Sequence, residues 1–268
     1  MSLFPPLRMN KPNLAAAMLL LFAINECAAQ DSLNTYKNSL EVSVRYEHYP
    51  KGPERTYHHF QYGRKIGQAD VFAKVLRYTL DKNVSYLFET EAYIKLKKKG
   101  YSYFDAAWSA SELLPNYRLR AELFENWKSF EYSAGIGVVK PHIFEAIPLL
   151  TGTLGYYFSD YFIYARPTFS YVEDGFSKSL FIQARRYFNK TDFLAVSVLR
   201  GADTGTNRNI NAIANSFGLD TYLARINGQA KKGRYKFGVG FDYGGIFIPT
   251  REEYLSFAGF DVFLNREF

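Results

Sequence analysis

The residues best suited to chemistry are charged side chains that alternate with apolar ones. Glu89 and Glu91 are two positions apart, which puts both carboxylates on one face of an extended strand. Paired carboxylates perform acid and base catalysis on glycosides. Arg118 and Arg120 repeat this spacing in a later segment, and ion pairs with them explain the two glutamates without catalysis. We favour the ion pairs, and we expect no catalytic residue, no metal site and no cofactor.

Arg166 is a second candidate, because it lies on the polar face of the segment 161–171. An inward arginine either binds an anionic or carbohydrate ligand or clamps a carboxylate such as Glu131. Glu122 continues the polar face of Arg118 and Arg120. The candidates for residues that line an interior are Glu89, Glu91, Arg118, Arg120, Glu122, Glu131 and Arg166.

A Ser-His hydrolase acting on lipids would require a histidine as its base. The four histidines are His48, His58, His59 and His142, and only His59 and His142 are conceivable bases. His58 and His59 are adjacent and point to opposite faces of a strand, so they do not form a metal pair.

The elements that position these residues are strands, because polar and apolar residues alternate strictly. In 235–243, Tyr, Phe and Val alternate with Lys, Gly and Asp, and 130–138 and 117–123 repeat the pattern. We predict fourteen strands, at 40–49, 56–64, 70–79, 84–94, 100–109, 116–125, 129–139, 147–157, 160–171, 176–187, 191–201, 217–227, 233–243 and 254–268.

The last segment points to a closed structure, because it alternates up to the aromatic residue Phe268. A soluble domain rarely leaves such a strand as a free edge, whereas in a closed barrel it pairs with the first strand. We therefore predict an all-β fold, a single antiparallel transmembrane β-barrel of about 14 strands, with 12 as the alternative. Connections after even-numbered strands are mostly short, which predicts that both termini are periplasmic.

The amino-terminal segment resembles a secretory signal peptide. Arg8 and Lys11 precede an apolar run, and Cys27-Ala-Ala29 ends in small residues. We expect residues 1–29 to be removed, 30–38 to form a short periplasmic lead and 39–268 to form the barrel. Removal lowers the net charge from +7 by about one and leaves the barrel without cysteine.

Composition agrees with a barrel in the outer membrane of a Gram-negative bacterium. Aromatic residues make up 18% of the chain, yet mean hydropathy is −0.23, as expected when only every second residue meets lipid. We interpret the aromatic clusters at 124–130, 156–161 and 187–193 as a periplasmic girdle. Basic residues are scattered, so we expect no nucleic-acid partner.

Two connections are notable. The segment Lys95-Leu-Lys-Lys-Lys99 is a solvated charge run, and 201–216 is the longest loop and our best recognition element.

Several segments together resemble the YaiO-type outer-membrane β-barrels. The strongest block is Thr151-Gly-Thr-Leu-Gly-Tyr-Tyr-Phe-Ser-Asp-Tyr-Phe-Ile-Tyr-Ala-Arg-Pro167, and Ser179–Phe188, Tyr101–Asp105, Leu113–Pro115 and Glu131–Gly135 accompany it. The resemblance implies a bacterial outer-membrane barrel and supplies no catalytic residues. Some relatives look like partners of surface-polysaccharide systems.

We consider three functions for such a barrel. The first is a non-enzymatic conduit or accessory barrel for polysaccharide export or assembly. The alternatives are a lipid-modifying acyl hydrolase and an adhesive barrel that acts through its outer loops. Expected partners are outer-membrane lipid and lipopolysaccharide, a surface polysaccharide, and the barrel-assembly machinery, which would bind the strand ending in Phe268.

Overall fold

The computed structural model describes most of the chain. The described residues are 37–96, 100–142, 145–172, 175–202, 220–248 and 252–268. The predicted signal peptide, most of the loop 201–216 and three lysines of the charge run lie outside the described residues.

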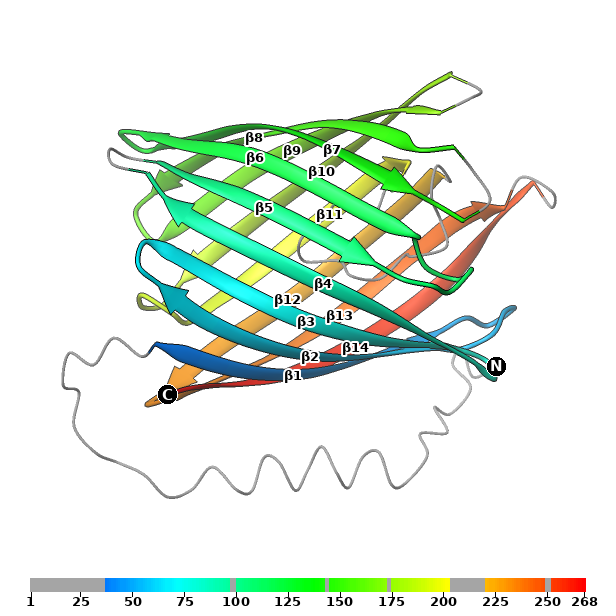
Figure 1. The fold of residues 1–268 in the computed structure, drawn as a ribbon, viewed down its shortest axis with the longest axis horizontal. Helices are drawn as coiled ribbons and strands as arrows, with labels where there is room; N and C mark the ends of the chain where they lie inside the picture. The colour runs from blue at the N-terminus through cyan, green and yellow to red at the C-terminus, as the bar shows by residue number, and fades with distance from the viewer. Residues whose placement is uncertain (1–36, 97–99, 143–144, 173–174, 203–219, 249–251) are drawn as a thin grey trace, which may run out of the picture. The chain divides into compact units, whose positions relative to one another are not determined.

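The described residues form a closed antiparallel barrel of fourteen strands, so the prediction of fourteen is confirmed and the alternative of twelve is wrong. Each strand pairs with its neighbours in sequence, and β1 pairs with β14 (Figure 1). The strands are β1 (Asn38–His48), β2 (Arg55–Ile66), β3 (Ala69–Leu80), β4 (Asn83–Lys95), β5 (Gly100–Trp108), β6 (Tyr117–Trp127), β7 (Phe130–Lys140), β8 (Ile147–Phe158), β9 (Tyr161–Val172), β10 (Gly175–Tyr187), β11 (Phe193–Ala202), β12 (Asp220–Lys232), β13 (Tyr235–Ile248) and β14 (Glu253–Glu267).

The ladder between β1 and β14 closes the barrel. Its register runs from Ser39 opposite Glu267 to His48 opposite Ala258. Beyond it, Asn38 and Phe268 exchange two backbone hydrogen bonds of 2.9 Å. The final strand therefore has a partner on both sides, as the alternation up to Phe268 predicts.

The two ends of the barrel differ in their connections. The short-turn end, on the left in Figure 1, holds Asn38, Phe268 and the six connections after even-numbered strands, four of them two residues long. In the two-residue turns at this end the first residue has a positive φ, at Gly67, Lys128, Ser159 and Gly233. The opposite end carries most of the longer connections, and we call it the long-loop end.

The ends of two strands lie five residues beyond the prediction. The segment 228–232, expected as a turn, belongs to β12, which runs from Asp220 to Lys232. Gly228, the first residue of this segment, pairs in the ladder opposite Val239. β13 extends to Ile248 because Gly244 and Gly245 continue the ladder opposite Phe257 and Ser256.

The outward face of the barrel is apolar. Leu119, Leu123 and Ile136 are at least half exposed in isolation. A surface of this extent is suited to lipid and not to water. Among the described residues no helix combines the length and the hydropathy needed to cross a bilayer.

The aromatic clusters at the short-turn end divide between the two faces, which corrects the prediction of a single girdle. Trp127, Phe130, Tyr156, Phe158 and Tyr161 are exposed and form an outward row with neighbouring ring centroids 4.9–6.4 Å apart. Phe124, Tyr157, Tyr187 and Phe193 lie on the inward positions of their strands. Alternation within each strand forces this division.

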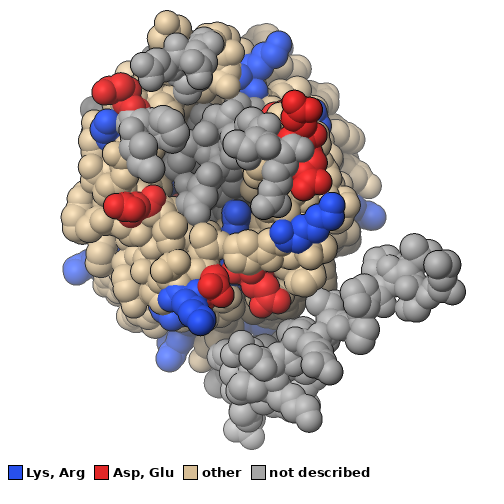
Figure 2. Space-filling model, turned by 90° about the vertical axis from the view of Figure 1, so that its right-hand side faces the viewer, with Lys and Arg blue, Asp and Glu red and all other residues tan. Residues whose placement is uncertain are grey.

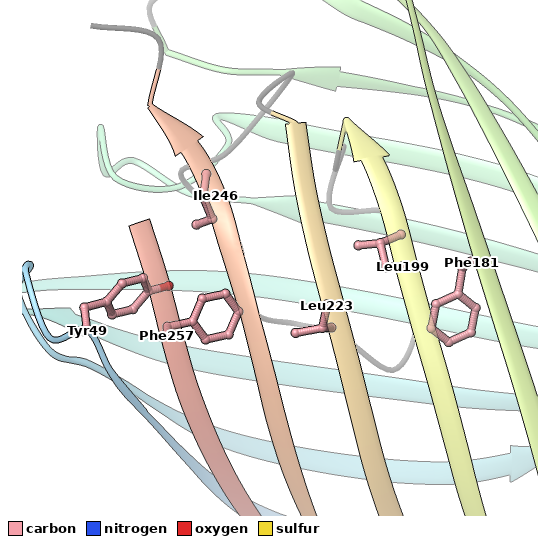
Figure 3. Packing of buried hydrophobic residues seen from close by; sticks show 6 residues of the cluster. All are labelled: Tyr49, Phe181, Leu199, Leu223, Ile246 and Phe257. Atoms are coloured by element: carbon pink, nitrogen blue, oxygen red, sulfur yellow. The ribbon is translucent and has the colours of Figure 1, made fainter. Parts of the chain in front are cut away.

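Inward side chains near the long-loop end include two apolar clusters. One cluster joins Tyr49, which directly follows β1, to Phe181, Leu199, Leu223, Ile246 and Phe257 of β10 to β14 (Figure 3). A second cluster holds Leu114 of the connection 109–116 against inward residues of β2 to β5. Because Leu114 is 2% exposed and Ser111 Oγ lies 2.5 Å from the inward Ser85 Oγ, this connection folds into the barrel.

The rim of the long-loop end carries charges of both signs (Figure 2). Exposed ion pairs there join Lys51 to Glu253 and Arg200 to Asp220. Such exposed pairs contribute little to stability.

Candidate functional site

The inner wall of β3 to β6 carries a continuous ionic network. Lys74 Nζ lies 3.0 Å from Glu89 Oε1 and 2.8 Å from Glu91 Oε2. Arg118 pairs with Glu89 and Asp105. Arg120 Nε donates to Asp105 Oδ2 at 2.8 Å. Inward residues on adjacent strands lie about 5 Å apart, which lets each charge reach its neighbour.

The carboxylates of this network lie close together. One oxygen from each of Glu89, Glu91 and Asp105 lies within 4.8 Å of the others. Three cationic side chains, Lys74, Arg118 and Arg120, already contact this group. The arrangement is therefore a balanced ionic network, with little negative charge left to attract a metal ion.

Arg166 forms a separate bidentate pair. Its Nη2 donates to Glu122 Oε2 at 2.7 Å, and its Nη1 donates to Oε1 at 3.1 Å. Ser133 Oγ donates to the same carboxylate at 2.5 Å. The arginine and glutamate side chains are 6% and 2% exposed, so the pair is almost entirely removed from solvent.

A third network covers the inner wall of β12 to β14 and β1. Asp242 accepts from Arg225 Nη1 and contacts Arg45 Nη2, both at 2.8 Å. Arg225 also reaches Asp261 at 2.7 Å. Glu47, with no exposed surface, accepts from Tyr49 and Tyr57 at 3.0 and 3.2 Å and pairs with Arg45.

Glycines on intervening strands let these long side chains lie flat against the wall. A Cβ atom at Gly135 would stand 2.8 Å from Glu122 Cβ and Cγ, too close for real side chains. At Gly240 a Cβ would stand 2.5 Å from both Arg225 Nη2 and Asp261 Oδ1. The pairs Arg166–Glu122 and Arg225–Asp261 therefore span intervening strands over small inward residues.

Among the described residues, Arg185 lacks the carboxylate partner that Arg118, Arg166 and Arg225 have. It donates to Tyr187 Oη at 3.0 Å and to Gln183 Oε1 at 2.9 Å, and it lies 4.3 Å from the Phe193 ring centroid. Within the described part of the chain no carboxylate pairs with it. Arg185 is thus a cation whose charge no anionic side chain of the described wall balances.

The seven residues predicted to line an interior occupy inward positions with different surroundings. Glu89, Arg118 and Arg120 join one network together with Glu91. Arg166 forms its ion pair with Glu122 and not with Glu131. Glu131 is half-buried near the short-turn end, opposite Gly155.

Sequence reasoning missed several inward residues of these networks. They are Lys74, Asp105, Arg45, Glu47, Arg225, Asp242 and Asp261. The signal was the alternation within each predicted strand: Arg45 lies on the polar face of 40–49, and Asp242 lies on that of 235–243.

The two candidate histidine bases lie in different parts of the barrel. His59 occupies an inward position opposite Ser43, and no hydrogen bond between their side chains occurs in the described structure. His142 lies in the connection after β7 and is half-buried.

A cavity of about 820 Å³ opens inside the short-turn end. Aromatic rings and polar groups share its lining, which consists of Gln61, Asp70, Phe72, Glu91, Tyr93, Lys95, Leu96, Gly100, Tyr101 and Asn126. The three lining rings continue into a row of inward aromatic side chains. We call this row the inner aromatic arc: Phe72, Tyr93, Tyr101, Phe124, Tyr157, Phe162, Tyr187 and Phe193.

Comparison with protein families identifies a matching domain. The YaiO membrane beta barrel domain matches residues 37–204, which span β1 to β11. A search of curated proteins gives no match.

Solved structures with a similar fold are bacterial barrels. The CymD monoaromatic hydrocarbon channel aligns with a TM-score of 0.55 at 9% identity, over 88% of this chain and 89% of its own. A bacterial polysaccharide outer membrane secretin gives 0.54 at 6% identity, over 88% and 99%. Omp33 from Acinetobacter baumannii gives 0.51 at 12% identity, over 87% and 98%. At these identities the likeness concerns the fold alone.

Proposed function

Because this chain belongs to the YaiO membrane beta barrel domain family and is an integral outer-membrane protein, we propose that it is a conduit or accessory barrel for surface polysaccharide. It is not an enzyme in this proposal. The partners are the outer-membrane lipids around the barrel and a surface polysaccharide, and the barrel-assembly machinery recognises β14. In this proposal the barrel is oriented in the outer membrane with its short-turn end facing the periplasm.

The arrangement of the inner charges is the observation that carries the proposal. Every ion pair described above joins strands no more than three apart, and the paired side chains lie along the wall. Ion pairs that crossed the lumen would obstruct a polar solute, whereas pairs along the wall leave a hydrophilic surface beside its path. The solved polysaccharide secretin with the same fold is consistent with such a passage.

Arg185 and its neighbour Arg186 provide a matched test. Arg185 points inward, whereas Arg186 points outward and lies over the rings of Tyr161 and Phe188. In planar bilayers we expect Arg185→Glu to shift ion selectivity toward cations, because it reverses an unbalanced charge in the lumen. Arg186→Glu should leave selectivity unchanged.

Two results would refute the conduit. One is the absence of conductance in the intact protein. The other is an unchanged amount of surface glycan after deletion of the gene.

The lipid-modifying alternative has less support. An acyl hydrolase needs its base beside a nucleophile at the lipid boundary, and His59 occupies an inward position. Acyl release from lipid by the intact protein, lost in His59→Ala or His142→Ala, would favour this alternative over the conduit. The adhesive alternative depends on the loop 201–216, most of which lies outside the described residues; binding lost on its removal would favour adhesion.

A further inference from the structure

The inner aromatic arc is unexpected for a wall that faces a polar interior. Water-facing positions favour polar residues, yet eight inward positions near the short-turn end are aromatic. Ring contacts link neighbours within three groups of the arc, which are Phe72 to Phe124, Tyr157 with Phe162, and Tyr187 with Phe193. The Tyr101 and Phe124 centroids lie 4.4 Å apart at 7°, and the Tyr157 and Phe162 centroids 4.0 Å apart at 17°.

Part of the arc is rigid and part is accessible. Phe124 is 2% exposed and supports one face of Tyr101. Tyr101, Tyr93 and Phe72 are half-buried and line the cavity. Rings held from behind and open in front are preorganised platforms, because little side-chain entropy is lost when a flat apolar surface stacks on them.

Polar groups stand beside these platforms in the same cavity. Gln61 and Asn126 bring amides, each with both donor and acceptor atoms, and Asp70 brings a carboxylate. Glu91 is fixed by Lys74 at 2.8 Å and by the Tyr103 hydroxyl at 2.9 Å. A carboxylate held in this way can still accept hydrogen bonds from a ligand hydroxyl.

From this juxtaposition we infer that the cavity and the inner aromatic arc bind the rings of a neutral oligosaccharide. A sugar ring presents an apolar C–H face and a rim of hydroxyls, which match the stacked aromatics and the amide and carboxylate groups. The cavity of about 820 Å³ falls within the range of ligand sites, about 300–1,000 Å³. The inference rests on the proposed conduit function and names the class of its solute.

Charge and polarity discriminate against two other ligand classes. A polyanion needs a net positive site, whereas Asp70 and Glu91 offset the nearby Lys74 and Lys95. An apolar hydrocarbon would leave the polar groups of Gln61 and Asn126 without partners, which is unfavourable.

Calorimetric titration of the purified full barrel in detergent tests the site without requiring conduction. The probes are maltohexaose, cellohexaose and chitohexaose, with dextran sulfate and toluene as competitors. Tyr101→Ala and Tyr93→Ala should each weaken binding of the preferred hexasaccharide at least tenfold, about 1.4 kcal/mol. Tyr101→Phe, which keeps the platform, and Tyr156→Ala, an outward ring at the same end, should stay within threefold. Retained resistance to unfolding by detergent at room temperature identifies the variants that fold.

The outcomes separate this site from the conduit. The site is overturned if no hexasaccharide binds, if toluene or dextran sulfate binds in its place, or if folded Tyr101→Ala and Tyr93→Ala bind as well as the unmodified protein. Conductance that responds to Arg185→Glu, without sugar binding, would refute the binding site and support the conduit. Sugar binding without conductance, together with an unchanged amount of surface glycan after deletion of the gene, would refute the conduit and support the binding site.

Discussion

Removing the Arg166 guanidinium should destabilise the barrel strongly. Arg166→Met keeps the length of the side chain but deletes its charge, so the Glu122 carboxylate keeps its hydrogen bond from Ser133 and loses the two from the guanidinium. Glu122 is 2% exposed as a side chain, so water cannot replace the two lost hydrogen bonds. Breaking a buried ion pair by removing one partner costs about 3–5 kcal/mol.

The double variant Arg166→Met with Glu122→Gln distinguishes the cost of an unpaired buried charge from the cost of altered side-chain packing. Neither charge is then left alone, so we expect the double variant to be about 1–3 kcal/mol more stable than the sum of the single changes predicts. The pair Lys51–Glu253 is the control, because its side chains are 73% and 39% exposed. Lys51→Met should cost no more than about 1 kcal/mol.

Urea-induced unfolding in lipid vesicles measures these differences. Trp108 and Trp127 face outward, 53% and 60% exposed in isolation, and their fluorescence reports transfer from lipid to water. An Arg166→Met cost no larger than that of Lys51→Met, or strict additivity in the double variant, would refute the view that the Arg166–Glu122 pair is isolated from solvent.

Three further predictions concern glycines, turns and pH. Gly135→Ala should cost about 1–3 kcal/mol in the same assay, because its Cβ would stand 2.8 Å from Glu122; Gly228→Ala, whose nearest neighbour is 3.4 Å away, should be neutral or stabilising. Ser159→Gly should stabilise by about 0.5–1 kcal/mol, because Ser159 has a φ of 48°, whereas Gly233→Ala at 59° should destabilise. Hydrogen bonds from Asn189 and from the Lys231 amide lower the pKa of Asp192. The ionised Asp192 carboxylate therefore stabilises the turn between β10 and β11 above the ordinary aspartate pKa, and this stabilisation is lost as pH falls through the lowered pKa. Amide exchange at Lys231 should therefore accelerate on acidification, and Asp192→Asn should remove that dependence; pH-independent exchange in the unmodified chain would contradict it.

Alternation accounts for what could be predicted. In 117–123 and 130–138 the period of two assigns each side chain to lipid or to the interior. The same rule, applied past Glu122, places Phe124 inside, although its aromatic character suggested the girdle. Composition at a strand end was therefore a weaker guide than position within the strand.

Partners within the lumen could not be predicted in the same way. Arg166 reaches Glu122 across β7 and β8 because of the register of three ladders and the space at Gly135. Register between strands depends on turn geometry and strand bounds, which a single sequence indicates to within a few residues. A slip of one residue in any of these ladders would turn the side chains of a strand to the opposite face, so Arg166 would no longer face Glu122.

The β1–β14 ladder has a consequence for how the barrel assembles. Every other ladder joins strands that are consecutive in the sequence, but Glu41 and Asn265, which share a hydrogen bond, are 224 positions apart. Bringing such distant segments together has a high entropic cost, so closure is the slow step of folding. Until then the chain is a curved sheet with two unpaired edges, β1 and β14, that can recruit other strands. The interval between insertion and closure is therefore when this protein is most exposed to misassembly.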